Sequence, residues 1–277
     1  MDLHNQKRLL TTVHTREGMD VERESARLAS LSLPHSGDYL NVVPSPALGL
    51  HLRTAEFNAV TKYRLGCPIY PTAEECPVST CHQPSDRMGD HAISCGAQGE
   101  RIARHNHLRD ILYHTAVSAS LGPTKEGRFL VPGTDGRPAD VLIPHWTGGK
   151  DSALDVTVIN PLQSATVTQA AIIPGHALTV AYDRKMRKAG EACKAAGIAF
   201  LPLPAETLGG WHDNAVFQIK KLGSALARQQ GRTVQEEAET IHHLFQRLSI
   251  SLMKGNASLI INRFQTFPTA QVDSDLE

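Results

Sequence analysis

Two aspartates stand in short apolar runs that are typical of neighbouring β-strands. Asp140 opens the run DVLIPHW, and Asp155 lies within ALDVTVIN, with Leu154 and Val156 on either side of it. A carboxylate enclosed by such side chains costs several kcal/mol unless a cation or hydrogen bonds compensate for its lost hydration. A hairpin would bring the two carboxylates together, and carboxylates with water and substrate phosphates suit Mg²⁺ or Mn²⁺. The pair therefore predicts a divalent metal site at one end of a hairpin.

Basic side chains follow on the next predicted helix. Lys185 and Lys188 are three residues apart in YDRKMRKAGEACK, so they share a helical face, with Arg184 and Arg187 beside them. A metal site that hydrolyses phosphate esters also needs a group that positions or deprotonates water and offsets charge on the phosphate. We expect one of the two lysines to supply it. Glu126, just before the first predicted strand, is a candidate third carboxylate for the metal.

The segment 66–98 carries cysteine and histidine but lacks the apolar periodicity that would let it bury itself. A structural Zn²⁺ would order it, since metal binding supplies folding free energy. Four residues in the pattern Cys-x4-Cys-x9-His-x3-Cys match a tetrahedral zinc site in chemistry and number: Cys76, Cys81, His91 and Cys95. Cys67 and His82 are substitute ligands, and the alternative is a loop with free thiols.

The helix predicted after this segment is basic in its first turns. Arg101, Arg104 and His105 are candidate contacts to nucleic-acid phosphates, as are Arg184 and Arg187 on the later helix. Such contacts raise affinity without reading base sequence. The alternative for each residue is a solvated polar face. The chain holds 28 Lys plus Arg and 28 Asp plus Glu, so any attraction to a polyanion must be local.

The positions of the strands that carry the aspartates are predicted from runs of β-forming residues and from the turn-forming residues between them. Three β-type runs, GRFLVPG, ADVLIPHW and ALDVTVIN, are separated by stretches rich in Gly, Asp and Pro. A helix over 176–196, closed by Gly197, leads into a fourth strand, IAFLPLP. With a helix before the first strand, the order α-β-β-β-α-β predicts an α/β fold with a mixed sheet.

Further helices complete the predicted architecture. One ends near Pro34 in VERESARLASLSL, a second covers LRTAEFNAVTKYRLG, and two more are expected near 213–230 and 233–253. The second has helical spacing through Phe57, Val60 and Leu65. The core-facing stripe of the helix before the first strand is expected to comprise Ile102, Leu108, Ile111, Leu112, Thr115 and Ala119.

Composition limits the class of protein. Hydrophobic residues make up 41% and charged residues 20%, which is ordinary for a globular chain and excludes fibrous and wholly disordered classes. The start MDLHNQKRLL has no apolar run typical of a signal peptide, and no stretch is long and apolar enough to span a membrane. We expect a soluble, intracellular protein without a membrane partner, whose clustered cysteines bind metal rather than form disulfides.

The spacing E-x13-D-x14-D on consecutive strands, in the order given above, resembles the PD-(D/E)XK restriction-like nuclease fold. More narrowly, RPADVLI, LDVTVINP and RKMRKAGEACKAAGIAFLPLPAETLGG resemble the C-terminal endonuclease region of site-specific non-LTR retrotransposon reverse transcriptase polyproteins. NVVPSPALGLHL and GDHAISCGAQGERIARHNHLRD resemble the linker and zinc loop that precede that region. The resemblance covers roughly residues 22–212.

The resemblance implies a nuclear, Mg²⁺-dependent endonuclease that nicks target DNA so that reverse transcription can prime from it, with DNA and the element RNA as partners. It implies Asp140 and Asp155 as metal ligands, Glu126 as an assisting one, and one of Lys185 and Lys188 acting on the hydrolytic water. It also divides the chain into an N-terminal helical arm and linker, a zinc-binding loop, a nuclease core, and C-terminal helices with a polar tail, at 1–65, 66–98, 99–212 and 213–277.

Two positions depart from the signature of that fold. Ala139 separates Pro138 from Asp140, where the signature has proline and aspartate adjacent, and Thr157 occupies the place of the signature lysine after Asp155. A lysine on the next helix is a known variation of the fold. The alternative function is a catalytically decayed remnant that binds nucleic acid through its zinc-dependent module.

Overall fold

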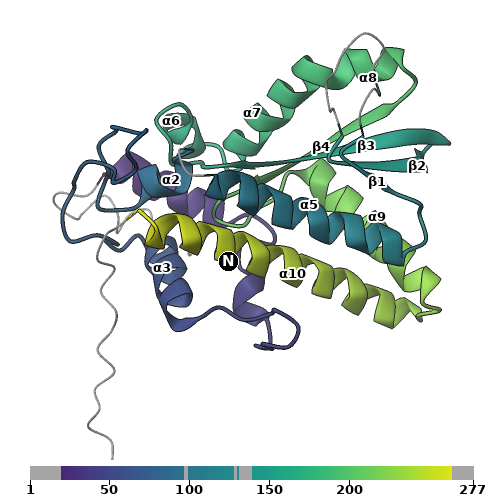
Figure 1. Ribbon diagram of the computed structural model, residues 1–277, viewed down its shortest axis with the longest axis horizontal. Helices are drawn as coiled ribbons and strands as arrows, with labels where there is room; N and C mark the ends of the chain where they lie inside the picture. Colours follow the sequence, from purple (N-terminus) through teal and green to yellow (C-terminus); the bar gives the residue numbers. More distant parts are fainter. Residues whose placement is uncertain (1–19, 97–98, 128–129, 131–138, 264–277) are drawn as a thin grey trace, which may run out of the picture.

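The computed structural model describes residues 20–96, 99–127, 130 and 139–263. Its centre is a four-stranded sheet in the order β1-β2-β3-β4 (Figure 1). The strands are β1 (Thr124–Lys125), β2 (Val141–Thr147), β3 (Lys150–Ile159) and β4 (Ala199–Glu206). The first two pairings are antiparallel and β3 pairs with β4 in parallel, so the expected α/β fold with a mixed sheet is confirmed.

The hairpin that carries the two aspartates closes through a pair of glycines. Gly148 and Gly149 have φ angles of +57° and +74°, which residues with a Cβ adopt only with strain. The hairpin register pairs Val141 with Leu154, and this places Asp140 at the end of β2 beside the middle of β3. The runs predicted for the second and third strands are thus confirmed, whereas most of GRFLVPG lies outside the described residues.

Three long helices cover one face of the sheet: α5 (Glu100–Ser118), α9 (Asp213–Gln229) and α10 (Val234–Ile261). Side chains of β2, β3 and β4 that point toward them form the largest hydrophobic cluster. Its members from the sheet and these helices include Val141, Ile143, Leu154, Val156, Leu203, Leu108, Leu112, Ile219, Leu222, Leu248 and Leu252. Tyr39 and Val60 belong to the same cluster, so the N-terminal segment shares this core.

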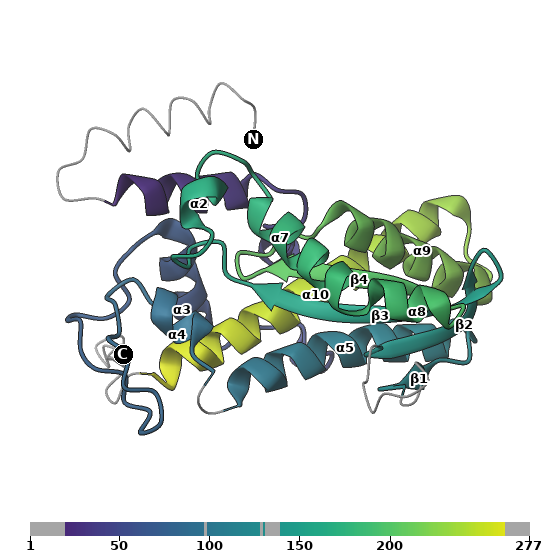
Figure 2. The ribbon, with the colours of Figure 1, turned by 90° about the horizontal axis from the view of Figure 1, so that it is seen from above.

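The crossover from β3 to β4 covers the other face. It consists of α6 (Val167–Ala170), α7 (His176–Lys185), a π-helical turn η2 (Met186–Gly190) and α8 (Glu191–Ala195). In Figure 2, α7 and α8 lie over β3 and β4, as a crossover between parallel strands requires. The predicted helix over 176–196 is therefore confirmed, and Gly197 ends it with a φ of +74°.

The N-terminal helices are α2 (Val21–Leu31), the 3₁₀ turn η1 (Asp38–Asn41), α3 (Thr54–Leu65) and the short α4 (Asp90–Ser94). The helix expected over LRTAEFNAVTKYRLG forms, but its buried face differs from the predicted spacing. Val60 is buried while Phe57 and Leu65 are exposed. Among the residues described, no helix has the length and apolar character needed to cross a membrane.

The predicted stripe of α5 is partly wrong. Ile102 is 65% exposed, and the side chains that face the interior are Arg104, Leu108, Arg109, Leu112, Thr115 and Ala116. Two arginines therefore take positions that hydrophobicity alone would assign to apolar residues. Their buried charges need partners inside the fold.

Candidate functional site

The three cysteines and one histidine predicted to bind zinc lie together. Their ligand atoms are all within 4.8 Å of one another. Cys81 Sγ lies 3.7 Å from Cys95 Sγ and 3.5 Å from His91 Nε2, and Cys76 Sγ lies 4.0 Å from Cys95 Sγ. Tetrahedral bonding to Zn²⁺ requires separations of about 3.8 Å between sulfurs and ~3.6 Å between sulfur and nitrogen. The cluster could therefore hold a metal such as zinc.

The two substitute ligands stand apart from this cluster. Cys67 is exposed. His82 is also exposed, and its Nδ1 lies 3.3 Å from a carboxylate oxygen of Glu75. Burial raises the pKa of Cys76 to about 11, so a thiolate there needs a cation beside it. The ligand set is thus the one that the spacing indicated.

Backbone hydrogen bonds shape the loop that presents the four ligands. Gly89 turns the chain with a φ of +85°, and a Cβ there would lie 2.8 Å from Ile69 Cδ1. The Asp86 carboxylate then accepts hydrogen bonds from the backbone N–H groups of Met88 at 2.8 Å and His91 at 2.7 Å. These contacts begin α4 and aim His91 at the cysteines.

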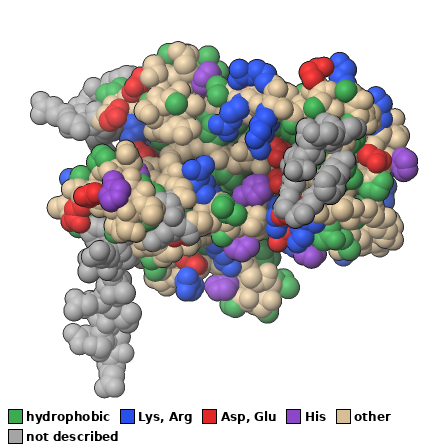
Figure 3. Space-filling view, turned by 45° about the horizontal axis from the view of Figure 1, so that its top comes forward, with side chains coloured by type: hydrophobic (Ala, Val, Ile, Leu, Met, Phe, Trp, Pro, Cys, Tyr) green, Lys and Arg blue, Asp and Glu red, His purple; other side chains and the backbone are tan. Residues whose placement is uncertain are grey.

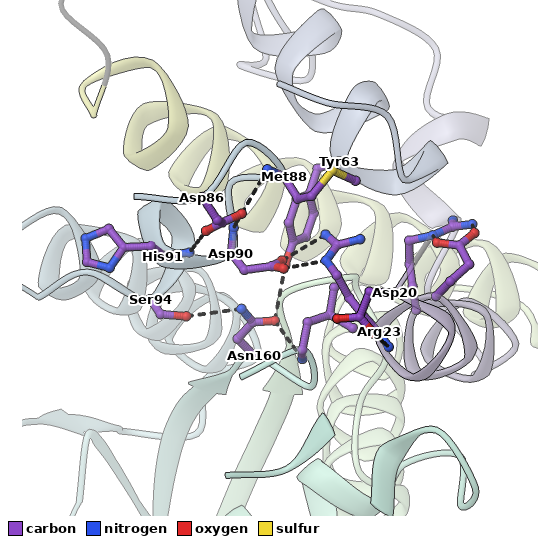
Figure 4. A network of polar contacts seen from close by, with 12 residues as sticks. Asp20, Arg23, Tyr63, Asp86, Met88, Asp90, His91, Ser94 and Asn160 are labelled. Carbon is purple, nitrogen blue, oxygen red and sulfur yellow. Dashed lines mark hydrogen bonds and ion pairs between the residues drawn. The ribbon is translucent and has the colours of Figure 1, made fainter. Parts of the chain in front are cut away.

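A polar network joins this loop to the end of β3 (Figure 4). Asn160 directly follows β3, and its Nδ2 donates to Ser94 Oγ of α4 at 3.1 Å. Its Oδ1 accepts from the Tyr63 hydroxyl at 3.2 Å. Asp90 of α4 binds the Arg23 guanidinium of α2, and burial is the main reason why the pKa of Asp90 is raised despite that cation. The metal cluster is therefore held in a defined position relative to the sheet.

The aspartates of the hairpin form a second site. Asp155 is 8% exposed, and Lys185 Nζ at the end of α7 lies 2.7 Å from its Oδ2. Asp140 Oδ2 accepts a hydrogen bond from the backbone N–H of Val156 at 2.6 Å. Since β2 begins at Val141, opposite Leu154, the backbone of Val156 has no strand neighbour on that side, and the Asp140 side chain takes that place.

His105 of α5 completes this arrangement. Its Nε2 lies 3.0 Å from Asp140 Oδ2 and 3.1 Å from the carbonyl oxygen of Val156. Both neighbours are acceptors, so Nε2 carries the hydrogen and donates to them. The hydrogen bond to Asp140 is the main reason why the pKa of His105 is raised. Sequence reasoning placed His105 among nucleic-acid contacts, and no spacing signal pointed to its contact with Asp140.

Burial and neighbouring charges shift the pKa of the Asp155 carboxyl in opposite directions. Desolvation raises its pKa most strongly, and the negative charge of Asp140 acts in the same direction, whereas the Lys185 ammonium opposes both. The Lys185 ammonium therefore favours the ionised form of Asp155. Of the two predicted lysines, Lys185 supplies the ammonium group beside Asp155. Lys188 is exposed and lies in the π-helical turn. Because a π-turn has more residues per turn than an α-helix, Lys188 does not share the face that an unbroken α-helix would give it.

Glu126 is held by other contacts. Its carboxylate forms an ion pair with Arg109, and its backbone N–H donates to the carbonyl oxygen of Asp140 at 2.9 Å. The ion pair with Arg109 competes with any role as a metal ligand. Glu126 as a third ligand therefore stays a prediction.

The five predicted nucleic-acid contacts differ in exposure, and His105 is half-buried against Asp140. Arg101, Arg184 and Arg187 are exposed. Arg104, in contrast, is only 3% exposed, and its Nη1 donates to Asn256 Oδ1 of α10 at 2.7 Å. The interpretation of Arg104 as a residue on a solvated face is thus wrong, because α10 packs over it.

A groove runs between the basic residues of α5 and His105, the neighbour of Asp140. It has a volume of about 330 Å³ and is lined by Gly96, Arg101, Ile102, Arg104, His105, Thr157 and Val158. Figure 3 shows Lys and Arg side chains near the middle of one face of the molecule, with histidine beside them. The net charge of zero therefore conceals a local basic surface.

No protein-family model matches the chain, and no curated protein matches it.

Proposed function

We propose that this protein is a divalent-metal-dependent endonuclease that hydrolyses phosphodiester bonds in DNA. The observation that carries the proposal is the ion pair of Lys185 with Asp155, formed beside Asp140 on the neighbouring strand. Two carboxylates and one lysine are the groups that such hydrolysis requires. They come from the residue that precedes β2, from the middle of β3 and from the end of α7, and they meet beside the inner strand β3.

The donor atoms of this site suit a hard cation. Within the described part of the chain, Oδ1 of Asp140 and Oδ1 of Asp155 accept no hydrogen bond, so each can serve as a ligand. Mg²⁺ and Mn²⁺ favour carboxylate oxygens and keep several waters. When bound, such a cation lowers the pKa of a coordinated water and stabilises negative charge on the phosphate.

The protein's own residues have separate tasks in this proposal. The Lys185 ammonium favours the ionised form of Asp155 and, beside that carboxylate, is placed to contact the attacking water or a phosphate oxygen. His105 Nε2 and the Val156 N–H together fix Oδ2 of Asp140, which leaves Oδ1 free to face the substrate. The basic groove beside His105 can hold the DNA backbone by charge.

Strand order and pairing sense support a PD-(D/E)XK type of core. Two antiparallel pairings followed by a parallel one, with a helix before β1 and a helical crossover before β4, agree with that topology. Thr157, at the position of the signature lysine, has no amine. In this proposal Lys185, whose Nζ lies beside Asp155, supplies the amine instead. We extend the proposal to retroelement origin, nicking of target DNA for reverse transcription in the nucleus, and Zn²⁺ as the metal of the cysteine cluster.

Plasmid nicking tests the proposal directly. The purified protein with Mg²⁺ or Mn²⁺ should convert supercoiled plasmid to the open circle, and Asp155→Asn should abolish this conversion. Asp213→Asn, at an exposed position of α9, is the matched control and should retain activity. Salt-sensitive DNA binding without cleavage by the wild-type protein in either metal would instead favour the decayed nucleic-acid-binding remnant.

A further inference from the structure

Within the part of the chain that the structure describes, Arg104 is a buried cation without a carboxylate partner. Its Nη1 donates to Asn256, its Nε has no hydrogen-bond partner, and no acidic side chain among the described residues forms an ion pair with it. Other buried arginines are paired: Arg23 with Asp90, and Arg263 with Glu100. A buried charge that lacks a counterion is costly, so the exception at Arg104 needs an explanation.

The position of Arg104 is built into the fold. Its aliphatic stem packs on Gly255 of α10, where an added Cβ would lie only 2.5 Å from Arg104 Cγ. Gly255 therefore makes room for the stem, and Asn256 beside it orients the guanidinium. Burial lowers the pKa of Arg104 to about 10, and the charge of Arg101 acts in the same direction. Arg104 still carries its positive charge at neutral pH.

The guanidinium borders a small polar cavity between α4, α5, the end of β3 and α7. The cavity has a volume of about 80 Å³. Its polar lining consists of Ser94, Arg101, Arg104, Asn160, Gln163 and Arg184. None of the lining residues is acidic, so three arginines face a space that holds no protein anion.

The size of the cavity and the chemistry of its lining side chains indicate the class of ligand that it could bind. The cavity is small, which suits one tetrahedral oxyanion better than a larger group. Guanidinium groups bind phosphate oxygens with paired, charge-assisted hydrogen bonds. The amides of Asn160 and Gln163 and the hydroxyl of Ser94 add neutral donors.

The cavity lies along β3 from the acidic pair. It is lined by Val158 and Ile159, three and four residues after Asp155, which places it about 10–13 Å away at the ~3.3 Å rise of a strand. It shares Arg101, Arg104 and Val158 with the groove that reaches His105. A single nucleic-acid strand can therefore contact both places, with different phosphates.

We infer that this cavity is a phosphate-binding subsite, in which Arg104, Arg101 and Arg184 hold a nucleic-acid phosphate adjacent to the one that is cleaved. The inference rests on the proposed nuclease function for the identity of the strand, but not for anion binding itself. The missing counterion of Arg104 is then supplied by the substrate. Its role is to fix the register of the strand relative to Asp140 and Asp155.

Phosphate binding can be measured without metal and without cleavage. Titration of the full chain with inorganic phosphate, followed by NMR of the arginine Nε–H groups, should shift the resonance of Arg104. Arg184→Gln and Arg101→Gln should each weaken phosphate binding about tenfold, since each removes one charged contact. Both residues are exposed, so these variants test the cavity without the unfolding that a change at buried Arg104 can cause. Arg228→Gln, at an exposed position of α9 and not lining the cavity, is the matched control.

Two results would overturn the subsite. One is an Arg104 resonance that phosphate does not move, and the other is an Arg228→Gln variant that binds phosphate as weakly as Arg184→Gln. If the wild-type protein bound phosphate but did not cleave plasmid, only the proposed nuclease function would be contradicted. The two failures are therefore distinguishable.

A competition experiment separates nucleic-acid phosphate from free phosphate. A short single-stranded oligonucleotide should displace inorganic phosphate from the wild-type protein. The salt dependence of oligonucleotide affinity measures the number of counterions released on binding, and Arg184→Gln should lower that number by about one. An oligonucleotide that leaves bound phosphate in place would show a site for the free anion and refute the nucleic-acid subsite.

Discussion

Lys185 Nζ lies 2.7 Å from Oδ2 of Asp155, although the two residues are thirty positions apart and belong to different elements. The ammonium offsets the burial of a carboxylate that has apolar neighbours on both sides in sequence. In the proposed nuclease site, Lys185 takes the part of the signature lysine of the restriction-like fold, whose position Thr157 occupies.

Replacement of Lys185 should separate its role from that of Lys188. Lys185→Met should lower the rate of plasmid nicking by about 10²–10⁴-fold, because it removes the cation that contacts the carboxylates. It should also raise the pKa of Asp155 further, which ¹³C NMR of the carboxyl group can detect. Lys188→Met is the control at an exposed position and should stay near wild-type activity. Equal losses in both variants would contradict the assignment.

His105 should act by positioning Asp140. His105→Ala should lower nicking activity or apparent metal affinity by about 10–100-fold, since residues that orient a ligand usually have effects of that size. The dependence of the nicking rate on Mg²⁺ concentration measures this change. His107→Ala, at an exposed position of the same helix, should leave that dependence unaltered. A His105→Ala enzyme with unchanged rate and metal dependence would remove His105 from the site.

The metal cluster should be structural. Cys95→Ser should abolish stoichiometric zinc binding, measured by elemental analysis, and lower Tm by roughly 10 °C, because the loop loses the free energy that metal binding contributes. A zinc chelator should have a similar effect on the wild-type protein. Cys67→Ser changes an exposed thiol outside the cluster and should retain both zinc and Tm. Retention of zinc by Cys95→Ser would mean that the ligand set is different.

Glu206 predicts a pH dependence of stability. It is 1% exposed, accepts a hydrogen bond from Ser30, and burial raises its pKa from 4.5 to about 7. The folded state thus binds a proton that the unfolded state releases between these values. The contribution of Glu206 to the free energy of unfolding is fully present below about pH 4.5 and is lost as pH rises through about 7. The free energy of unfolding changes by on the order of 3 kcal/mol over this range.

Urea unfolding at several pH values measures this effect. The free energy of unfolding of Glu206→Gln relative to the wild type should rise as pH increases from 4.5 to 8, because the amide stays neutral throughout. A difference that does not vary with pH would show that the carboxyl group titrates normally. The Asp213→Asn variant should show no comparable trend, since Asp213 is exposed.

Local patterns predicted much of the architecture. The hairpin strands, the crossover helix ending at Gly197 and the fourth strand follow from residue type and turn formers that act over a few residues. The cluster of possible metal ligands, Cys76, Cys81, His91 and Cys95, was also predictable, because few types of side chain bind metal and all four lie within one loop. Such features depend on neighbours in the chain.

The orientation of α5 was not recognisable in this way. The apolar spacing favoured Ile102 as a core residue, whereas Arg104 faces the interior. Helical periodicity counts hydrophobic residues and cannot register that Gly255 and Asn256, about 150 positions later, provide room and a hydrogen bond for a guanidinium. The burial of an arginine depends on partners that only folding supplies.

The sequence by itself determined which chemical groups are present and in which elements they lie: two aspartates on paired strands, basic residues on two helices, and a loop of metal-binding side chains. Tertiary structure alone decided which of them meet. It brought Lys185 rather than Lys188 to Asp155, joined His105 to Asp140, and engaged Glu126 with Arg109. The physical reason is that a few ångströms between elements decide these contacts, and those distances depend on how the helices pack against the sheet.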